Sequence, residues 1–139
     1  MEKIKNKMAE KGFYHCFGCS PDNPKGLKME FYKDDDEIVS YFAPSWYYDG
    51  WDGIMHGGII ATLMDETGAW TVMHLLGKTG VTTTLTVKYK RPVKTLNGKV
   101  EIRGKIEHIR HNIAHIKTEL RDNNGNLCSE AEMNYYLRK

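Results

Sequence analysis

The chain has 139 residues, 40% hydrophobic and 27% charged, with a formal net charge of +2. This length is typical of one compact domain, so we expect a single domain over 1–139, with 1–26 as an N-terminal helix and loop extension. The weak charge argues against a nucleic-acid partner recognised through a basic surface. Three cysteines are too few, and odd in number, for a disulfide framework, which favours a reducing compartment.

The N-terminal segment alternates charges and lacks the apolar region of a signal peptide, and no apolar stretch is long enough to span a membrane. We therefore expect a cytoplasmic protein without a membrane partner. Glu2–Lys11 is predicted to form a short amphipathic helix, because Ile4 and Met8 are four residues apart and Gly12 follows as a stop. The next segment, HCFGCSPDNPKGL, is rich in turn-forming residues and is predicted to be a loop.

Two short strands and an aromatic loop are predicted next. LKMEFYK alternates apolar and polar residues, and IVSYFAP follows the turn DDDE, so each is predicted to be a strand. SWYYDGWDGIM is predicted to be a loop. Gly57–Leu76 is predicted to be a long helix that ends at Gly77, a residue type common after helix C-termini. Its almost wholly apolar surface is typical of a helix buried on most sides.

Four strands are predicted after the helix, in TTLTVKYKRP, KVEIRGKIEHI, AHIKTEL and LCSEAEMNYYL. In the first, Leu85, Val87 and Tyr89 share one face. Asn124-Gly125 predicts a tight hairpin between the last two strands. Strands with one apolar and one polar face predict an antiparallel sheet, wet on one side and covered by the helix on the other. The fold class is therefore α+β.

Two carboxylates, Asp65 and Glu66, interrupt the apolar helix, where a buried charge is costly without partners. For Glu66 the sequence favours a side chain that reaches solvent or a surface lysine. For Asp65 the same interpretation is the alternative to a functional role. The small residues Ala61, Gly68 and Ala69 lie near the Asp65 face and would let a ligand or a second backbone approach.

The start of the helix carries the pair Gly57 and Gly58. Backbone N–H groups at a helix N-terminus have no acceptor within the helix, and the helix dipole stabilises negative charge placed beside them. Without side chains, these residues would let a ligand oxygen approach, as in an oxyanion hole. The alternative interpretation is that the pair only permits a tight turn into the helix.

The stretch GIMHGGIIATLMDE resembles the signature of the hotdog-fold acyl-CoA thioesterases of the PaaI-like family. In that family His-Gly-Gly begins a helix and an acidic residue follows nine positions after the histidine, here His56 and Asp65. CFGCSPDNPKGL and TTTLTVKYKRPV are also similar to family segments. The resemblance implies a curved antiparallel sheet wrapped around one long central helix, and a homodimer or a homotetramer built as a dimer of dimers.

The resemblance also implies a site that hydrolyses an acyl-CoA, or another acyl thioester, to a free acid and a thiol. The Gly57 amide, assisted by that of Gly58, would polarise the carbonyl. Asp65 of the partner chain would act as general base or as nucleophile. Thr82 matches a serine or threonine position in related enzymes and would orient the water or the carboxylate, while His56 would fix the loop. No metal and no cofactor are required.

Helix geometry separately favours a shared site, because Gly57 and Asp65 lie about 12 Å apart along one helix axis. An antiparallel partner helix would bring the two together. Trp51 and its aromatic neighbours would line an acyl pocket or, alternatively, form core at the junction of loop and sheet. Lys90 and Arg91 would contact coenzyme A phosphates or simply belong to a solvated strand face.

The loop before His-Gly-Gly departs from the family. Many relatives have Asn or Gln near the position of Gly50, and Asp49 and Asp52 would repel a working carboxylate. We therefore expect a different organisation of the substrate-facing loop.

The sequence also bears on four other interpretations. Cys16-x-x-Cys19 has zinc-ligand spacing, but the remaining cysteine, Cys128, is in a distant predicted strand, so loop packing is favoured over zinc. An α/β-hydrolase would need a Gly-x-Ser-x-Gly elbow, which the sequence lacks. A non-catalytic acyl-CoA sensor or carrier, and a hotdog hydratase or dehydratase, remain alternatives to the thioesterase.

Overall fold

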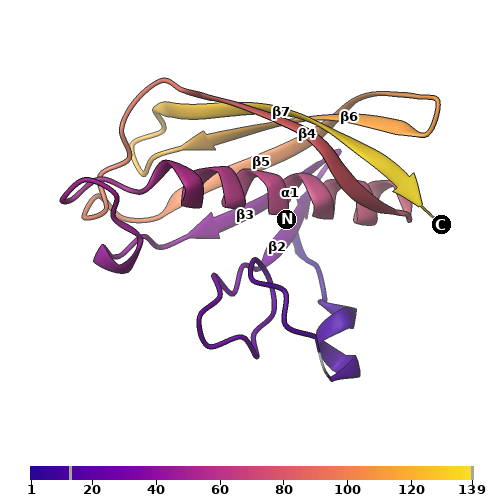
Figure 1. Cartoon of the computed structure of the whole chain (residues 1–139), viewed down its shortest axis with the longest axis horizontal. Helices are drawn as coiled ribbons and strands as arrows, with labels where there is room; N and C mark the ends of the chain where they lie inside the picture. The colour runs from indigo at the N-terminus through magenta and orange to yellow at the C-terminus, as the bar shows by residue number, and fades with distance from the viewer. Residues whose placement is uncertain (13, 139) are drawn as a thin grey trace.

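One seven-stranded antiparallel sheet packs against one long helix, α1 (Gly57–Leu76), in the computed structural model, which describes residues 1–12 and 14–138. The strand order is β1-β2-β3-β5-β6-β7-β4, and the sheet curves over the helix (Figure 1). The strands are β1 (Glu2–Lys3), β2 (Phe31–Asp34), β3 (Glu37–Phe42), β4 (Thr79–Tyr89), β5 (Val100–Arg110), β6 (Ile113–Arg121) and β7 (Leu127–Arg138). The predicted α+β fold with one central helix is confirmed.

The predicted bounds of α1 are confirmed, and both ends are capped. The His56 side chain accepts a hydrogen bond from the Gly58 N–H at 2.8 Å, which satisfies one free amide of the first turn. Gly77 adopts a left-handed conformation with φ 66°, and its N–H bonds the Met73 carbonyl at 3.0 Å. No helix among the described residues is long and apolar enough to cross a membrane.

The core lies between α1 and the concave face of the sheet. Alternate residues of β5, β6 and β7 point inward, as their period-two pattern predicts. The largest of these fully buried side chains are Ile102, Ile116, Leu120, Met133 and Tyr135. On another side of the helix, Trp70 stacks on Phe31 of β2 with ring centroids 4.5 Å apart.

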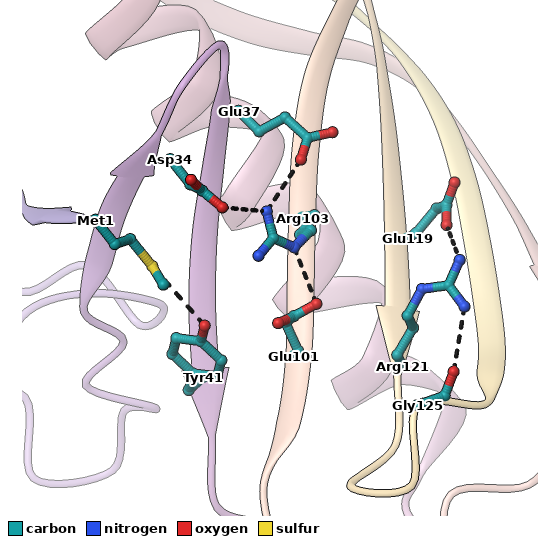
Figure 2. Close-up of polar contacts among 9 residues, drawn as sticks. All are labelled: Met1, Asp34, Glu37, Tyr41, Glu101, Arg103, Glu119, Arg121 and Gly125. Carbon is teal, nitrogen blue, oxygen red and sulfur yellow. Dashed lines mark hydrogen bonds and ion pairs between the residues drawn. The ribbon is translucent and has the colours of Figure 1, made fainter.

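The outer face of the sheet is charged. Arg103 on β5 bonds Asp34 at 2.8 Å, Glu37 at 3.0 Å and Glu101 at 2.9 Å (Figure 2). A single guanidinium thus holds three carboxylates from three strands. This arrangement suits a face that stays in contact with water, as the polar alternation predicts.

The predicted helix over Glu2–Lys11 is wrong. Glu2–Lys3 pairs with β2 as strand β1, and only Lys7–Lys11 is helical, as a short 3₁₀-helix. The Ile4 N–H donates to the Phe31 carbonyl at 2.8 Å. The open edge of β2 therefore offers backbone partners that outweigh the weak helix pattern.

The predicted strand LKMEFYK begins only at Phe31. The N–H groups of Leu27 and Met29 donate instead to carbonyls of the preceding loop, those of Phe17 at 2.8 Å and Gly18 at 2.9 Å. The other predicted strands are confirmed with small shifts at their ends. The hairpin at Asn124-Gly125 is also confirmed, with Gly125 at φ 83°.

Strand β4 forms one edge of the sheet and, within residues 1–12 and 14–138, pairs only with β7. Its predicted apolar face does point toward the helix side, yet Leu85 is 37% exposed and Tyr89 is 53% exposed. We expected the helix to cover the apolar faces of all the long strands. For β4 this expectation is wrong in a single chain. The free edge and its apolar side chains remain available for a further partner.

Candidate active site

Asp65 is held in place by two hydroxyl groups from the sheet. Its Oδ1 accepts a hydrogen bond from Thr82 Oγ1 of β4 at 2.9 Å and lies 2.9 Å from the Tyr135 hydroxyl of β7. That hydroxyl is also 2.7 Å from the Asp65 carbonyl oxygen. Over residues 1–12 and 14–138 no side-chain or backbone donor reaches Oδ2. The carboxylate is thus oriented through one oxygen and free to act through the other.

Tyr135 was not identified from the sequence as a site residue. It is fully buried, and its hydroxyl is also 2.9 Å from Met133 Sδ. Burial, together with the neighbouring Asp65, raises the pKa of Tyr135 far above its usual value, so the hydroxyl keeps its proton and donates. The alternation of apolar and polar residues in β7 could have identified Tyr135, because it points this side chain inward, where a buried hydroxyl needs a hydrogen-bond partner.

Gly68 does not leave room for a second chain, contrary to the sequence interpretation. A Cβ at this position would collide with the Tyr135 hydroxyl and would lie 2.5 Å from Met133 Sδ. The absent side chain is therefore what lets the tyrosine reach Asp65. Ala61 and Ala69 are half-buried.

The N-terminus of α1 forms a second site element. No described residue accepts the Gly57 N–H, whereas the Gly58 N–H is taken by the His56 side chain. The Tyr89 hydroxyl donates to the Gly57 carbonyl at 2.7 Å, which fixes the peptide from the β4 side. Of these two amides, only that of Gly57 lacks an acceptor among the described residues, and the His56 side chain caps the helix.

A cavity of about 420 Å³ opens at this helix end. It is lined by Gly50, Trp51, Met55, His56 and Gly57. Trp51 is 84% exposed, so the interpretation of this residue as core is wrong. A cavity of about 590 Å³ lies elsewhere, beside Trp70 and Phe31. Trp70 packs in that region and does not border the Gly57 cavity.

Asp49 is engaged within its own loop. Asp49 Oδ2 accepts the Gly53 N–H at 2.9 Å and so stabilises its own loop. The Gly50 N–H donates to the Ile54 carbonyl at 2.8 Å, and a Cβ on Gly50 would lie only 3.2 Å from the His56 Cα. The loop is thus closed tightly around His56, which explains why it has no amide side chain at Gly50.

Lys90 and Arg91 follow Tyr89 and are exposed. The Lys90 ammonium lies 3.2 Å from Glu130 on the neighbouring strand, and both backbone amides bond the Cys128 carbonyl. The two cations therefore sit at the same end of β4 as the helix N-terminus.

Glu66 does not reach a surface lysine, contrary to the sequence interpretation. The Cys16 thiol donates to its Oε1 at 3.1 Å, and the Gly18 backbone packs directly on its side chain. Burial raises the pKa of Glu66. The glutamate beside Asp65 therefore belongs to the contact between the helix and the N-terminal loop.

A curved antiparallel sheet that packs around one long helix defines a hotdog-fold protein. Here the helix has a free backbone N–H at its N-terminus and a carboxylate at its middle. The family model of the Thioesterase superfamily matches residues 52–129, which include α1 and strands β4 to β6. The chain belongs to this superfamily.

One curated relative is the acyl-coenzyme A thioesterase THEM4 of Xenopus laevis, 38% identical over 81 residues. The match covers 58% of this chain but only 36% of THEM4, so the chain spans about a third of that relative's length.

Solved structures share the fold at lower identity. Thioesterase HI1161 of Haemophilus influenzae is 23% identical with a TM-score of 0.74, and the match covers 81% of this chain and 80% of that one. A thioesterase protein of Streptococcus pneumoniae, solved with coenzyme A, is 22% identical with a TM-score of 0.73. That match covers 79% of this chain and 85% of the other.

Proposed function

We propose that this protein hydrolyses acyl-CoA thioesters in a site shared by two copies of the chain. The observation that carries the proposal is the Asp65 carboxylate, oriented by Thr82 and Tyr135 on a half-exposed helix face. The Gly57 N–H, which borders a cavity and has no acceptor among the described residues, would polarise the thioester carbonyl. Membership of the Thioesterase superfamily, and a relative named as an acyl-CoA thioesterase, support this reaction class.

The edge strand supports a specific dimer. Asp65 contacts β4 at Thr82, and Gly57 contacts it at Tyr89. If two β4 strands pair antiparallel with the two-fold axis at Thr86, the irregularity between Thr82 and Thr84 puts Thr82 opposite the partner's Tyr89. Each Asp65 would then approach the partner's Gly57, and the pairing would cover the exposed apolar face of β4. A dimer of two such dimers would contain the same sites.

In the proposed reaction the thioester carbonyl oxygen accepts the N–H of the partner's Gly57. Asp65 takes a proton from water as the water oxygen adds to the carbonyl carbon, and the oxyanion is stabilised by that N–H and the helix dipole. The carbon–sulfur bond then breaks, and the thiolate leaves and takes up a proton. In the nucleophilic alternative, Asp65 adds to the carbon, the thiolate leaves, and water hydrolyses the mixed anhydride.

The acyl chain would lie in the cavity beside Trp51, and the nucleotide phosphates would approach Lys90 and Arg91. The free thiols of Cys16, Cys19 and Cys128 support the cytoplasm as the compartment, since a reducing environment preserves them. No step of this scheme draws on a metal or a cofactor.

The test is thiol release from acyl-CoAs of varied chain length by the wild type and Asp65→Asn. The substitution keeps the shape of the side chain and removes its basicity, so kcat should fall at least ~10²-fold while the fold stays intact. Asp52→Asn, in the loop near Gly57, is the matched control and should retain full activity. Near-full activity of Asp65→Asn, or a change at an acyl double bond without thiol release, would contradict the proposal.

A further inference from the structure

The N-terminal loop and the helix bring together three donors that the sequence separates. Cys16, Cys19 and Glu66 each offer one sulfur or oxygen atom, and these atoms all lie within 4.8 Å of one another. Cys16 Sγ and Glu66 Oε1 are 3.1 Å apart. The sequence offered no third or fourth zinc ligand near the two cysteines, and Glu66 of α1 lies where a third would be.

The loop is built to hold both sulfurs. The Ser20 N–H donates to the Cys16 carbonyl at 3.0 Å, which closes the Cys-x-x-Cys turn. The Ser20 hydroxyl donates to the Tyr14 carbonyl at 2.6 Å, and Asn6 donates to the Cys19 carbonyl at 3.2 Å. Ser20 is fully buried. These contacts fix the loop independently of the two thiols.

Among residues 1–12 and 14–138, no lysine, arginine or histidine forms a salt bridge with Glu66. The Tyr14 hydroxyl lies 2.7 Å from Cys19 Sγ, and Asp65 adds further negative charge beside Glu66.

From this geometry we propose that Cys16, Cys19 and Glu66 form a zinc site that fastens the N-terminal loop to α1. In a tetrahedral site with Zn–S near 2.3 Å and Zn–O near 2.1 Å, ligand atoms are about 3.5–3.8 Å apart. The donors need to move by only about 1 Å to meet this geometry. Two thiolates and a carboxylate suit zinc, and a water beside the Tyr14 hydroxyl completes the tetrahedron.

The site is separate from the thioester chemistry, although its glutamate is next to Asp65 in sequence. Glu66 faces the N-terminal loop, whereas Asp65 faces β4 and β7. The expected role is structural: zinc ties a loop far from the helix in sequence to the middle of α1 and stabilises the folded chain.

The test is zinc content of the full chain, purified under reducing conditions and equilibrated with one equivalent of zinc. About one bound zinc per chain is expected. Cys16→Ser, Cys19→Ser and Glu66→Gln should each weaken zinc binding by more than about 100-fold, since loss of an outer-shell partner alone costs roughly 10–100-fold. Cys128→Ser, which removes the third cysteine away from the cluster, is the matched control and should keep its zinc.

Two further readouts keep the test decisive if a variant fails to fold. In the wild type, cobalt should give thiolate-to-metal absorption, and chelation should lower the melting temperature until zinc is restored. Absence of bound zinc in the reduced wild type, a melting temperature unaffected by chelation, or unchanged zinc binding in Cys16→Ser would overturn the proposal. Isolation of the wild type only as a Cys16–Cys19 disulfide without metal would overturn it as well.

Discussion

The Tyr135 hydroxyl is the position where a single-atom change best tests how Asp65 is oriented. Tyr135→Phe removes a donor 2.9 Å from the carboxylate and 2.7 Å from the Asp65 carbonyl, and keeps the buried ring. A hydrogen bond to a charged group contributes about 1.5–3 kcal/mol. Because each 1.36 kcal/mol is a factor of ten in rate, kcat should fall by roughly 10- to 100-fold, with KM little changed.

The assay is thiol release at saturating acyl-CoA, with urea unfolding of the same preparations. Tyr136→Phe is the matched control, because the adjacent tyrosine is 48% exposed on the opposite face of β7. Thr82→Ala and Tyr135→Phe should have non-additive effects on kcat in the double variant, because both hydroxyls contact the same Oδ1 of Asp65. A Tyr135→Phe enzyme with wild-type kcat would refute the positioning role.

Two further predictions concern packing and substrate choice. Gly68→Ala should destabilise the fold by about 1–3 kcal/mol in urea unfolding, because the new Cβ would collide with buried side chains. Gly57→Ala, whose Cβ would be in ordinary contact with a tyrosine ring, is the control, and equal stability of the two variants would refute this reasoning. The wild type should prefer medium-chain over acetyl substrates by roughly ten-fold or more in kcat/KM, since each buried methylene contributes about 0.8 kcal/mol. Trp51→Ala should reduce this preference. Trp46→Ala, 71% exposed and outside the cavity, should leave that preference intact, and equal wild-type rates on acetyl- and octanoyl-CoA would exclude the pocket.

The strong periodic segments of the sequence predicted the fold well. The helix Gly57–Leu76 and the hairpin at Asn124-Gly125 came from local signals, namely an apolar run with a terminal glycine and a tight-turn pair. The N-terminal segment was mispredicted, because Glu2–Lys3 is a strand only through the distant edge of β2. Local propensity carries no information about such an edge.

The site was predictable only in part, for the same reason. Asp65 and Gly57 could be selected because a charge in an apolar helix and glycines at a helix start are unusual within a short window. Tyr135 and the contact of Glu66 with Cys16 depend on pairs that are 70 and 50 residues apart. Gly68 was misread because its close neighbours come from β7 and not from a second chain.

The central claim is that each site combines Gly57 of one chain with Asp65 of another, and mixed dimers test it most directly. Gly57→Pro removes the amide hydrogen at the first helical position, where proline is well tolerated and where His56, at ψ 133°, already has the conformation that precedes proline. Asp65→Asn removes the base. Each variant alone should be nearly inactive.

The measurement is thiol release after the two variants are unfolded together in equal amounts and refolded. In a mixed dimer one site carries both substitutions and the other carries neither, so random pairing should restore about a quarter of the wild-type activity. Co-refolding of each variant with itself is the control and should restore nothing. If the mixture is as inactive as its components, the amide and the carboxylate do not come from different chains, and the shared site is wrong.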